Sequence, residues 1–381
     1  MFNLFSSQPA FGLDISDLSL KLIQLKKDRD QIKLYASNEI VVPEGCIVSG
    51  IIKKPKEVVE LIKKIIKTSL GNKILTFNAV VSLPETKTFI KLIEISQIEN
   101  KKIREIIEQE ISQHIPLVKE DMYFDWQVIG KIIKNNEQKM QILIGATPKN
   151  IVDSYADILE KAGVIIQVFE IEACAIIRNL IREEDNDPQI ILDLGASRSS
   201  LIIYNHGIIQ FSISMRFSGE KLTKLIASKL KINTKEAEKA KKLCGVDENK
   251  CQGIPREILL EYLSDLSEEI KKILVFHKTH FSFKRVFKRI ILCGGGSNLI
   301  GLDDYLSTQT GLTVEKEIPW IFKSQCLFDN KKATLKSILS DFFFQSMFSK
   351  KIKSCPFSED KFASHATVLG LALRGVIDSE E

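Results

Sequence analysis

Three turns built from small residues each follow an apolar strand and suit close approach by a phosphate. They cover 14–21, 193–200 and 294–297, within FGLDISDLSLKLIQL, IILDLGASRSSLII and LCGGGSNLIG. Side chains beyond Cβ would keep a polyphosphate away from backbone N–H groups, so turns of this composition can cradle one. A lone GGG after a strand is more often a tight turn than a ligand site. The three turns taken together predict a binding site.

Two of these turns begin with an aspartate at a strand end. Asp14 and Asp193 could each hold Mg²⁺ through its waters. A helix directly after the glycines would turn its free amides and its dipole toward an anion. The Walker pattern GxxxxGK[ST] is missing, and LCGGGSNLIG does not supply GxGxxG at the start of a βαβ unit. The sequence therefore predicts a magnesium–polyphosphate site of another class.

The elements that must position these turns occur twice. The two aspartate turns read as hairpins about 180 residues apart, which predicts two matching halves that face one another. Between them, 85–165 reads as strand, helix, two strands, helix and strand, a compact α+β module. From 165 onward the pattern of the first half returns.

Length and composition indicate an ordinary globular protein of more than one domain. The chain has 381 residues, 44% hydrophobic and 27% charged. It has no run of 18 uncharged apolar residues, and MFNLFSSQPAFGLD does not resemble a signal peptide. The net charge of +5 comes without a nucleic-acid-binding motif, so we expect no nucleic-acid partner. Seven cysteines without a CxxC favour reduced cytosolic thiols over disulfides or a zinc site.

Segments along nearly the whole chain resemble the PilM family of type IV pilus assembly proteins. This family is related to the division protein FtsA, within the actin, Hsp70 and sugar-kinase superfamily. The segments are FGLDISDLSLKLIQL, ISQHIPLVKEDMYFDWQVI, EIEACAIIRNL, LDLGASRSSLII, SGEKLTKLIASKLKINTKEAEKAKK, LCGGGSNLIGLDDYL and VLGLALRG. The resemblance implies an α/β, actin-like two-lobed fold of paired RNase H-like domains with an inserted α+β subdomain. The first lobe would comprise 1–84, 166–188 and 364–381, the insert 85–165, and the second lobe with its adenosine-covering subdomain 189–363.

The resemblance also implies ATP and Mg²⁺ as ligands, with Asp14 and Asp193 as the metal candidates. The residues that it assigns to the nucleotide are Asp14, Ile15, Ser16, Asp17 and Lys21 in the first hairpin, Asp193, Gly195, Ser197 and Ser199 in the second, Gly219, Glu220 and Lys221 beside the ribose, Glu236 and Lys239 beside the base, and Gly294, Gly295, Gly296 and Ser297 over the adenosine and α-phosphate. Ser16 and Asp17 depart from the glycine and small residue usual in the family. A carboxylate beside a phosphate is repulsive, which lowers the expected affinity.

The function implied by the resemblance is an ATP-binding scaffold in the cytoplasm, peripheral to the inner membrane through its partners. It would hold the N-terminal cytosolic tail of a PilN-like membrane protein in a groove formed by 86–95 and 97–113, and it would contact motor and assembly proteins of the pilus machine. Hydrolysis is expected to be slow or absent. Glu170 and Glu172 are weak candidates to position a water, and a structural role has at least as much support. Self-association is left open.

Two other functions remain as alternatives at this stage. A small-molecule kinase of the same superfamily is disfavoured by the inserted module and by the lack of an evident acceptor-activating aspartate. An FtsA-like filament former tethered to the membrane is disfavoured because LALRGVIDSEE is acidic rather than basic and amphipathic.

Overall fold

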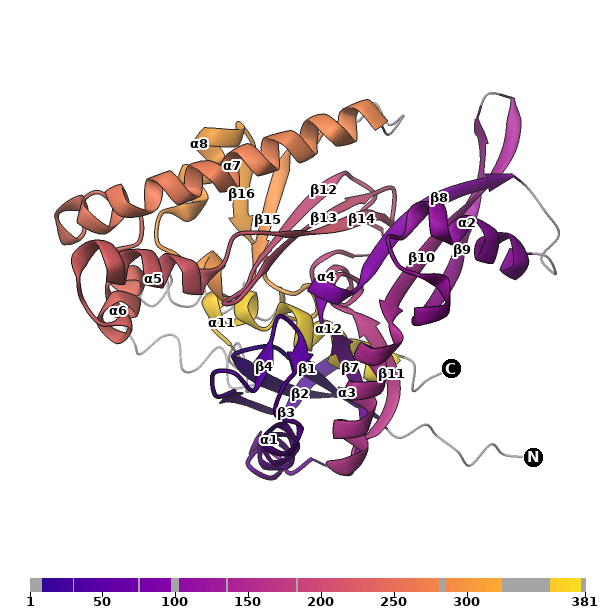
Figure 1. Cartoon of the computed structure of the whole chain (residues 1–381), viewed down its shortest axis with the longest axis horizontal. Coiled ribbons are helices and arrows are strands. Elements are labelled where there is room, and N and C mark those ends of the chain that lie inside the picture. The colour runs from indigo at the N-terminus through magenta and orange to yellow at the C-terminus, as the bar shows by residue number, and fades with distance from the viewer. Residues whose placement is uncertain are drawn as a thin grey trace, which may run out of the picture.

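Two sheets with the same strand order form the two lobes of the protein (Figure 1). The computed structural model describes residues 9–29, 31–74, 76–96, 103–134, 136–182, 184–280, 286–323 and 357–377. In each lobe three antiparallel strands are followed by two strands parallel to the first of them. The repeated hairpins of the sequence thus occupy equivalent places in two matching halves.

The first sheet has the order β11-β7-β1-β2-β3-β6, and the second lobe contributes β16-β15-β12-β13-β14. The strands of the first sheet are β1 (Phe11–Ile15), β2 (Ser19–Asp28), β3 (Gln31–Val41), β6 (Leu70–Gly71), β7 (Asn78–Leu83) and β11 (Ile165–Ile171). Those of the second lobe are β12 (Gln189–Leu194), β13 (Ser199–Asn205), β14 (Ile208–Met215), β15 (Arg289–Cys293) and β16 (Thr313–Lys316). A separate two-stranded ribbon pairs β4 (Ile47–Val48) with β5 (Ile51–Ile52).

Helices cover the outer faces of both sheets and fill the junction between the lobes. The first lobe carries α1 (Pro55–Lys67) and α3 (Lys149–Lys161), and the second carries α5 (Gly219–Leu230), α6 (Thr234–Cys244), α7 (Ile254–His280) and α8 (Leu302–Thr310). The junction contains α4 (Glu172–Leu180), α11 (Glu359–Ser364) and α12 (Ala366–Ile377). Within the described ranges, no helix is long and apolar enough to cross a bilayer.

The two central helices α4 and α12 connect the lobes. On α4, Ile176 packs with Ile202 of the second sheet, whereas on α12, Leu369 packs with Ile23 of the first sheet. The helices touch backbone to backbone, because a Cβ at Gly370 would lie only 1.8 Å from the carbonyl oxygen of Ala175. A side chain at position 370 would push the lobes apart.

The inserted module extends the second sheet rather than forming a sheet of its own. Its strands are β8 (Phe89–Ser96), β9 (Met122–Lys134) and β10 (Glu137–Pro148), and its helix is α2 (Ile103–His114). β8 joins β14 through the single pair Phe211 and Lys91. Ile107 and Ile111 of α2 pack with Ile142 and Ile144 of β10, so the module has a core separate from those of the lobes.

Helix α3 belongs by its packing to the first lobe, although the sequence places it within the 85–165 module. Tyr155 and Leu159 lie in one cluster with Phe11 and Leu13 of β1. The hydroxyl of Tyr155 donates to the carbonyl oxygen of Gly50, 3.1 Å away. The apolar stripe of α3 predicts that one face of the helix is buried, but it does not predict which sheet that face packs against.

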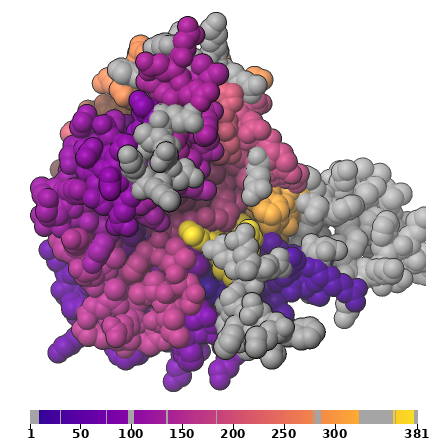
Figure 2. Space-filling view, turned by 90° about the vertical axis from the view of Figure 1, so that its right-hand side faces the viewer, coloured from indigo at the N-terminus to yellow at the C-terminus, as the bar shows by residue number. Residues whose placement is uncertain are grey.

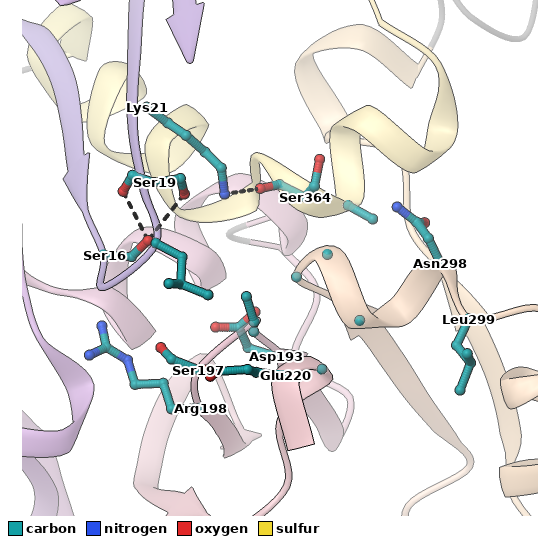
Figure 3. A pocket seen from close by; sticks show the side chains of 18 of the residues that line it. Ser16, Ser19, Lys21, Asp193, Ser197, Arg198, Glu220, Asn298, Leu299 and Ser364 are labelled. Carbon is teal, nitrogen blue, oxygen red and sulfur yellow. Dashed lines mark hydrogen bonds between the residues drawn. The ribbon is translucent and has the colours of Figure 1, made fainter. Parts of the chain in front are cut away.

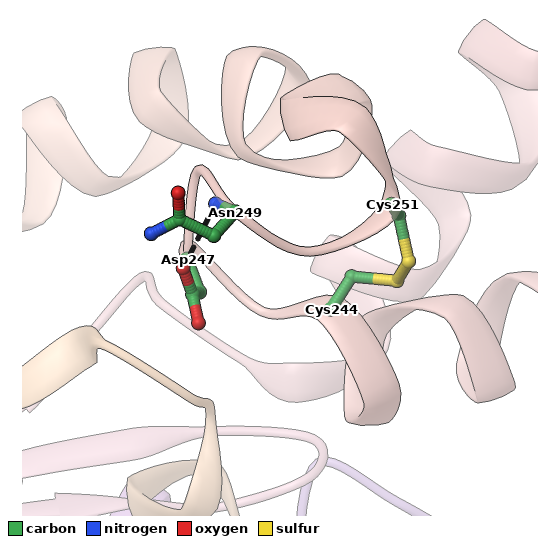
Figure 4. Close-up of a disulfide and its surroundings, with 4 residues drawn as sticks. All are labelled: Cys244, Asp247, Asn249 and Cys251. Carbon is green, nitrogen blue, oxygen red and sulfur yellow. Dashed lines mark hydrogen bonds between the residues drawn. A yellow bond between two sulfur atoms is a disulfide. The ribbon is translucent and has the colours of Figure 1, made fainter.

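A disulfide joins Cys244 and Cys251 (Figure 4). The sequence favoured reduced thiols throughout, and for this pair the expectation was wrong. The turn between α6 and the short helix η4 (Cys251–Gly253) brings the two Cα atoms within 5.8 Å of each other, a separation typical of disulfides. Spacing alone did not reveal this, because the approach depends on how the turn folds back.

Replacing Gly370 by alanine tests the contact between α4 and α12. We expect Gly370→Ala to lower the free energy of unfolding by about 3 kcal/mol, because the added methyl meets backbone that cannot move aside. Gly130→Ala is the matched control, since nothing lies within 4 Å of a Cβ at that position; it should change stability by less than about 0.5 kcal/mol. Urea denaturation measures both, and equal stability of the two variants would contradict the proposed contact.

Candidate functional site

A cleft of about 730 Å³ lies between the lobes, and all three small-residue turns line it. This volume is in the range of sites for small molecules and cofactors. Figure 3 shows the first hairpin and the second hairpin facing each other across the cleft, with the glycine turn to one side. The predicted site residues that line the cleft are Asp14, Ser16, Lys21, Glu172, Asp193, Gly195, Ser197, Gly219, Glu220, Gly294, Gly295 and Gly296.

The first hairpin is held by its own hydroxyls and by helix α11. The Ser16 hydroxyl donates to the carbonyl oxygen of Ser19 at 2.9 Å, and the backbone N–H of Ser16 reaches the same oxygen at 3.0 Å. Lys21 donates from Nζ to the carbonyl oxygen of Ser364, 2.7 Å away (Figure 3). Serine at position 16 is thus accommodated as part of the turn, and the Lys21 ammonium is tied across the cleft to the C-terminal segment.

Asp17 and Ile15 are not among the residues that line the cleft. The Asp17 carboxylate is 7% exposed and accepts the backbone N–H groups of Ser49 and Gly50, each at 2.9 Å. Its charge is therefore used to fix a neighbouring loop of the first lobe. The Ile15 side chain is buried in the core of the same lobe, so Ile15 offers only its backbone to the hairpin.

The second hairpin turns tightly around Gly195. A Cβ there would lie 2.3 Å from the carbonyl oxygen of Arg198, which excludes any larger residue. The N-terminus of α5 is anchored on this turn, since Glu220 N–H donates to the Ala196 carbonyl at 2.8 Å. Ser197 lines the cleft, whereas Ser199 is buried and lies outside the lining.

The glycine turn approaches the second hairpin closely. Gly294 has a positive φ of 77°, and a Cβ on it would lie 2.4 Å from Oδ1 of Asp193. A Cβ on Gly296 would lie 2.8 Å from the carbonyl oxygen of Leu194. Gly295 differs, because nothing lies within 4 Å of its Cβ position. Two glycines therefore allow the turn to pack, and the third leaves the cleft open. Ser297 is buried and donates to the Gly294 carbonyl at 2.7 Å.

Helices α5 and α6 close the cleft on the side of the second lobe. Lys241 donates from Nζ to the Gly219 carbonyl and to the Thr223 hydroxyl, both at 2.9 Å. Glu238 pairs with Lys241 at 2.7 Å, and both residues line the cleft. The residues predicted beside the base, Glu236 and Lys239, are exposed and lie outside the lining. Lys221 also points elsewhere, to the Arg216 carbonyl at 2.7 Å.

Buried acidic groups gather at the floor of the cleft and beside it: Asp193 and Glu172 line the cleft, and Glu85 lies next to Glu172. Burial raises the pKa of Asp193 to about 6, with Lys21 acting in the opposite direction and Asp14 in the same one. Burial also raises the pKa of Glu172 to about 8, although Arg198 counters it. The pKa of the Glu85 carboxyl is likewise raised by burial. These buried carboxyl groups are therefore easier to protonate than carboxyl groups in water.

The two glutamates considered for water positioning lie in different surroundings. Glu172 lines the cleft, forms an ion pair with Arg198 and accepts the backbone N–H of Glu85 at 3.3 Å. Glu170 is 5% exposed and is held by Arg178 at 2.7 Å and Arg374 at 3.0 Å. Glu170 therefore has the contacts of a structural ion-pair cluster, and of the two only Glu172 reaches the cleft.

Asp14 and Asp193 face the same cleft as the two metal candidates. Asp14 accepts the Ser82 hydroxyl at 3.0 Å, and the Cys293 thiol lies 3.8 Å from Asp193 Oδ1. In the part of the chain that the structure describes, no group of three or more His, Cys, Asp or Glu side chains is arranged to hold a metal. Two carboxylates suit a cation bound mainly through water and a phosphate ligand, as Mg²⁺ usually is.

Comparison with known proteins identifies the family. The family described as type IV pilus assembly protein PilM matches residues 12–324. The chain belongs to the PilM family. A solved PilM–PilN type IV pilus biogenesis complex is similar, with a TM-score of 0.74 and 21% identity, over 97% of this chain and 99% of that one. The ethanolamine utilization protein EutJ of Carboxydothermus hydrogenoformans matches with a TM-score of 0.53 and 13% identity, over 96% and 89% of the two chains.

A curated relative places this PilM family member near FtsA. The cell division protein FtsA of Streptococcus pneumoniae is 24% identical over 198 residues, which cover 48% of this chain and 43% of FtsA. The chain thus spans less than half the length of the curated relative that it matches. Together with the solved structures, these matches confirm the predicted family and the actin-like α/β fold.

Several cleft residues of this PilM family member were missed by sequence reasoning. They are Ser19, Glu39, Arg198, Thr223, Glu238, Lys241, Lys242, Asn298 and Ser364. A signal existed for Lys241, since it shares a helix face with Ala237 and Cys244, which are both buried. Arg198 also stood out in the sequence as a large cation within a run of serines.

Replacing Asp193 by asparagine tests the electrostatic cost of the cleft in this PilM family member. The folded-state pKa of about 6 lies above the ordinary value of 3.8, so the folded protein binds this proton more tightly than the unfolded chain. The free energy of unfolding of the parent therefore falls as Asp193 loses its proton, between about pH 4 and about pH 6. We compare the free energies of unfolding of Asp193→Asn and the parent without nucleotide. The value for the variant relative to that of the parent should rise by on the order of 1 kcal/mol between pH 4 and pH 7.5.

Asp303→Asn is the control for Asp193→Asn, because Asp303 is exposed on α8, away from the cleft lining. The difference in free energy of unfolding between Asp303→Asn and the parent should not change with pH. A difference for Asp193→Asn that is also constant across this range would refute the assignment of the raised pKa. Thermal or urea denaturation at the two pH values gives the comparison.

Proposed function

We propose that this PilM family member is an ATP-binding scaffold of a type IV pilus or type II secretion-like inner-membrane assembly. The observation that carries the proposal is the convergence of three side-chain-poor turns on one cleft between two lobes. Backbone N–H groups that a large anion can reach are the usual means of binding phosphates. Family membership supplies the machine in which such a scaffold would work.

The cleft residues fit a magnesium nucleotide. Asp14 and Asp193 would hold Mg²⁺ through its waters, and Mg²⁺ would offset the acidic groups on the cleft floor. The open side of Gly295 leaves room for the adenosine and α-phosphate. Glu238 and Lys241 take the place beside the base that the family resemblance implied for Glu236 and Lys239, because they line the cleft together with Lys242, whereas Glu236 and Lys239 do not.

The surroundings of Glu172 support slow or absent hydrolysis. Its carboxylate already contacts the Arg198 guanidinium and the backbone of Glu85. A carboxylate held by two donors has less freedom to orient an attacking water than one that faces the ligand alone. This arrangement suits a protein in which bound nucleotide braces the lobes.

The proposed partner is the N-terminal cytosolic tail of a PilN-like membrane protein, which would bring the scaffold to the inner face of the membrane. β8 pairs with β10 along its whole length but with β14 at one position only. Elsewhere its second edge has no strand partner among the described residues, and an extended peptide can add to such an edge. In Figure 2 the module (purple) stands above α3 (magenta) on this side of the molecule.

The proposed groove uses β8 and α2, with 97–102 of the expected helix lying outside the described residues. The similar solved structure is a PilM–PilN complex, which supports a partner of this kind. Motor and assembly proteins of the pilus machine are further proposed partners.

Filling the open side of the glycine turn tests nucleotide binding. We expect Gly295→Leu to weaken the affinity for Mg·ATP by at least about ten-fold, because the new side chain enters space that the cleft leaves free. Its free energy of unfolding should change by less than about 1 kcal/mol. Gly130→Leu, in open space on β9, should leave the affinity unchanged. Isothermal titration calorimetry measures both affinities. An unchanged affinity of Gly295→Leu for Mg·ATP would contradict the proposal that the nucleotide binds beside Gly295.

A peptide pull-down tests the partner. The purified chain should enrich the N-terminal cytosolic peptide of a PilN-like protein over a scrambled peptide of the same composition, because the free β8 edge recognises extended backbone and its neighbours select side chains. The experiment is run with and without Mg·ATP. Failure to enrich the peptide in both conditions would leave only the family membership and the fold.

A further inference from the structure

Arg198 lies at the tip of the second hairpin and reaches α4 in the junction between the lobes. Its side chain is 12% exposed and forms an ion pair with Glu172 on α4, which is 8% exposed. In Figure 3 its guanidinium lies beyond Ser197 and below Ser16, at the opposite end of the cleft from Asn298 and Leu299. Arg198 therefore occupies the end of the cleft where the two phosphate hairpins meet.

Only one edge of this guanidinium is satisfied. Nη2 contacts Glu172, whereas Nη1 is buried and has no hydrogen-bond partner within the described part of the chain. Leaving a buried donor without an acceptor is unfavourable, and for charged groups the penalty is larger than for neutral ones. Arg198 lines the cleft, so a ligand bound there can supply the acceptor that Nη1 lacks once the side chain turns this nitrogen toward it.

The acids near Arg198 do not provide this acceptor. Asp14, Asp17 and Glu172 all contribute to its electrostatic surroundings. The Asp17 carboxylate is bound to the backbone of Ser49 and Gly50, and Asp14 accepts from Ser82. An anion with oxygens on several sides suits the fork of an arginine best, because the fork can serve two acceptors at once.

We propose that Arg198 donates from Nη1 to the terminal phosphate of a nucleoside triphosphate, so that the cleft prefers a triphosphate over a diphosphate. This inference rests on the proposed nucleotide binding and deepens it. The adenosine side of the nucleotide lies by Gly295 and Asn298, and the phosphates run between the hairpins toward Arg198. Glu172 holds the other edge of the guanidinium and so fixes its orientation, which makes Arg198 a specificity residue and Glu172 its positioning partner.

The test compares the affinities for a non-hydrolysable ATP analogue and for ADP, both with Mg²⁺, by isothermal titration calorimetry. The parent protein should bind the analogue at least about ten-fold more tightly than ADP, a difference that one charge-assisted contact can supply. Arg198→Ala should bring the two affinities within about two-fold of each other, mainly by lowering the affinity for the analogue. Arg289→Ala is the control, because Arg289 forms ion pairs with Glu315 and Glu317 and does not line the cleft.

Two further variants separate this role from a structural one. Arg198→Lys keeps a cation beside Glu172 and serves if Arg198→Ala does not fold. It should lower the preference for the analogue by at least about three-fold, because a compact ammonium lacks the planar fork that places one donor edge on Glu172 and the other on the phosphate. Glu172→Gln should lower the preference less than Arg198→Ala does, since glutamine can still accept from Nη2 but no longer carries the charge that orients the guanidinium. A purely structural ion pair would instead leave the ratio of the two affinities unchanged in all three variants.

The outcomes distinguish this inference from the function on which it rests. If the parent binds neither nucleotide, the proposed nucleotide binding fails and the inference fails with it. If the parent binds both and the ratio of affinities is the same in the arginine variants, Arg198 is not the triphosphate determinant and the nucleotide-binding function stands. A ratio that falls in the arginine variants, falls less in Glu172→Gln and persists in Arg289→Ala supports the inference.

Discussion

The backbone contact between α4 and α12 is the constraint on which the cleft depends. Gly370 meets the carbonyl of Ala175 with no room for a side chain, and the two helices together pack against both sheets. The two lobes are thereby held at one separation, and hairpins that are far apart in the sequence face each other across a gap of nucleotide size. A turn that binds phosphate in one lobe is useful only when its counterpart is held at this distance.

The acids of the cleft show how a site works against the stability of its own fold. Burial raises the pKa of Asp193 and Glu172, so the protein keeps ionisable groups where water solvates them poorly. Lys21 and Arg198 offset part of this effect, and a ligand that carries Mg²⁺ would offset more. Local conflicts of this kind are expected where a protein binds something, and here they coincide with the three turns that the sequence singled out.

The sequence predicted the three turns because their signals are local: glycines, small hydroxyls and aspartates directly after apolar strands. The pattern of α6 indicates that the face with Ala237 and Cys244 is buried, but it could not predict that Lys241 on that face reaches Gly219 and Thr223 of α5 beside the cleft. Nor could the sequence predict that Asp17 turns to Ser49 and Gly50, which are more than 30 residues away in the chain. For the same reason the packing of α3 on the first sheet and the approach of Cys244 to Cys251 became visible only in three dimensions.

The one-residue join between β14 and β8 has a mechanical consequence. A sheet that is continuous over many hydrogen-bonded pairs resists bending, but here the backbone pairing of β14 with β8 is reduced to Phe211 and Lys91. The other contacts at this join, such as that of Ile90 with Ile202, are made by side chains. So short a backbone pairing gives little resistance to rotation of the module about the join. Any such rotation would displace the far tip of the β9–β10 hairpin more than the base of the module, because the tip lies farther from the join.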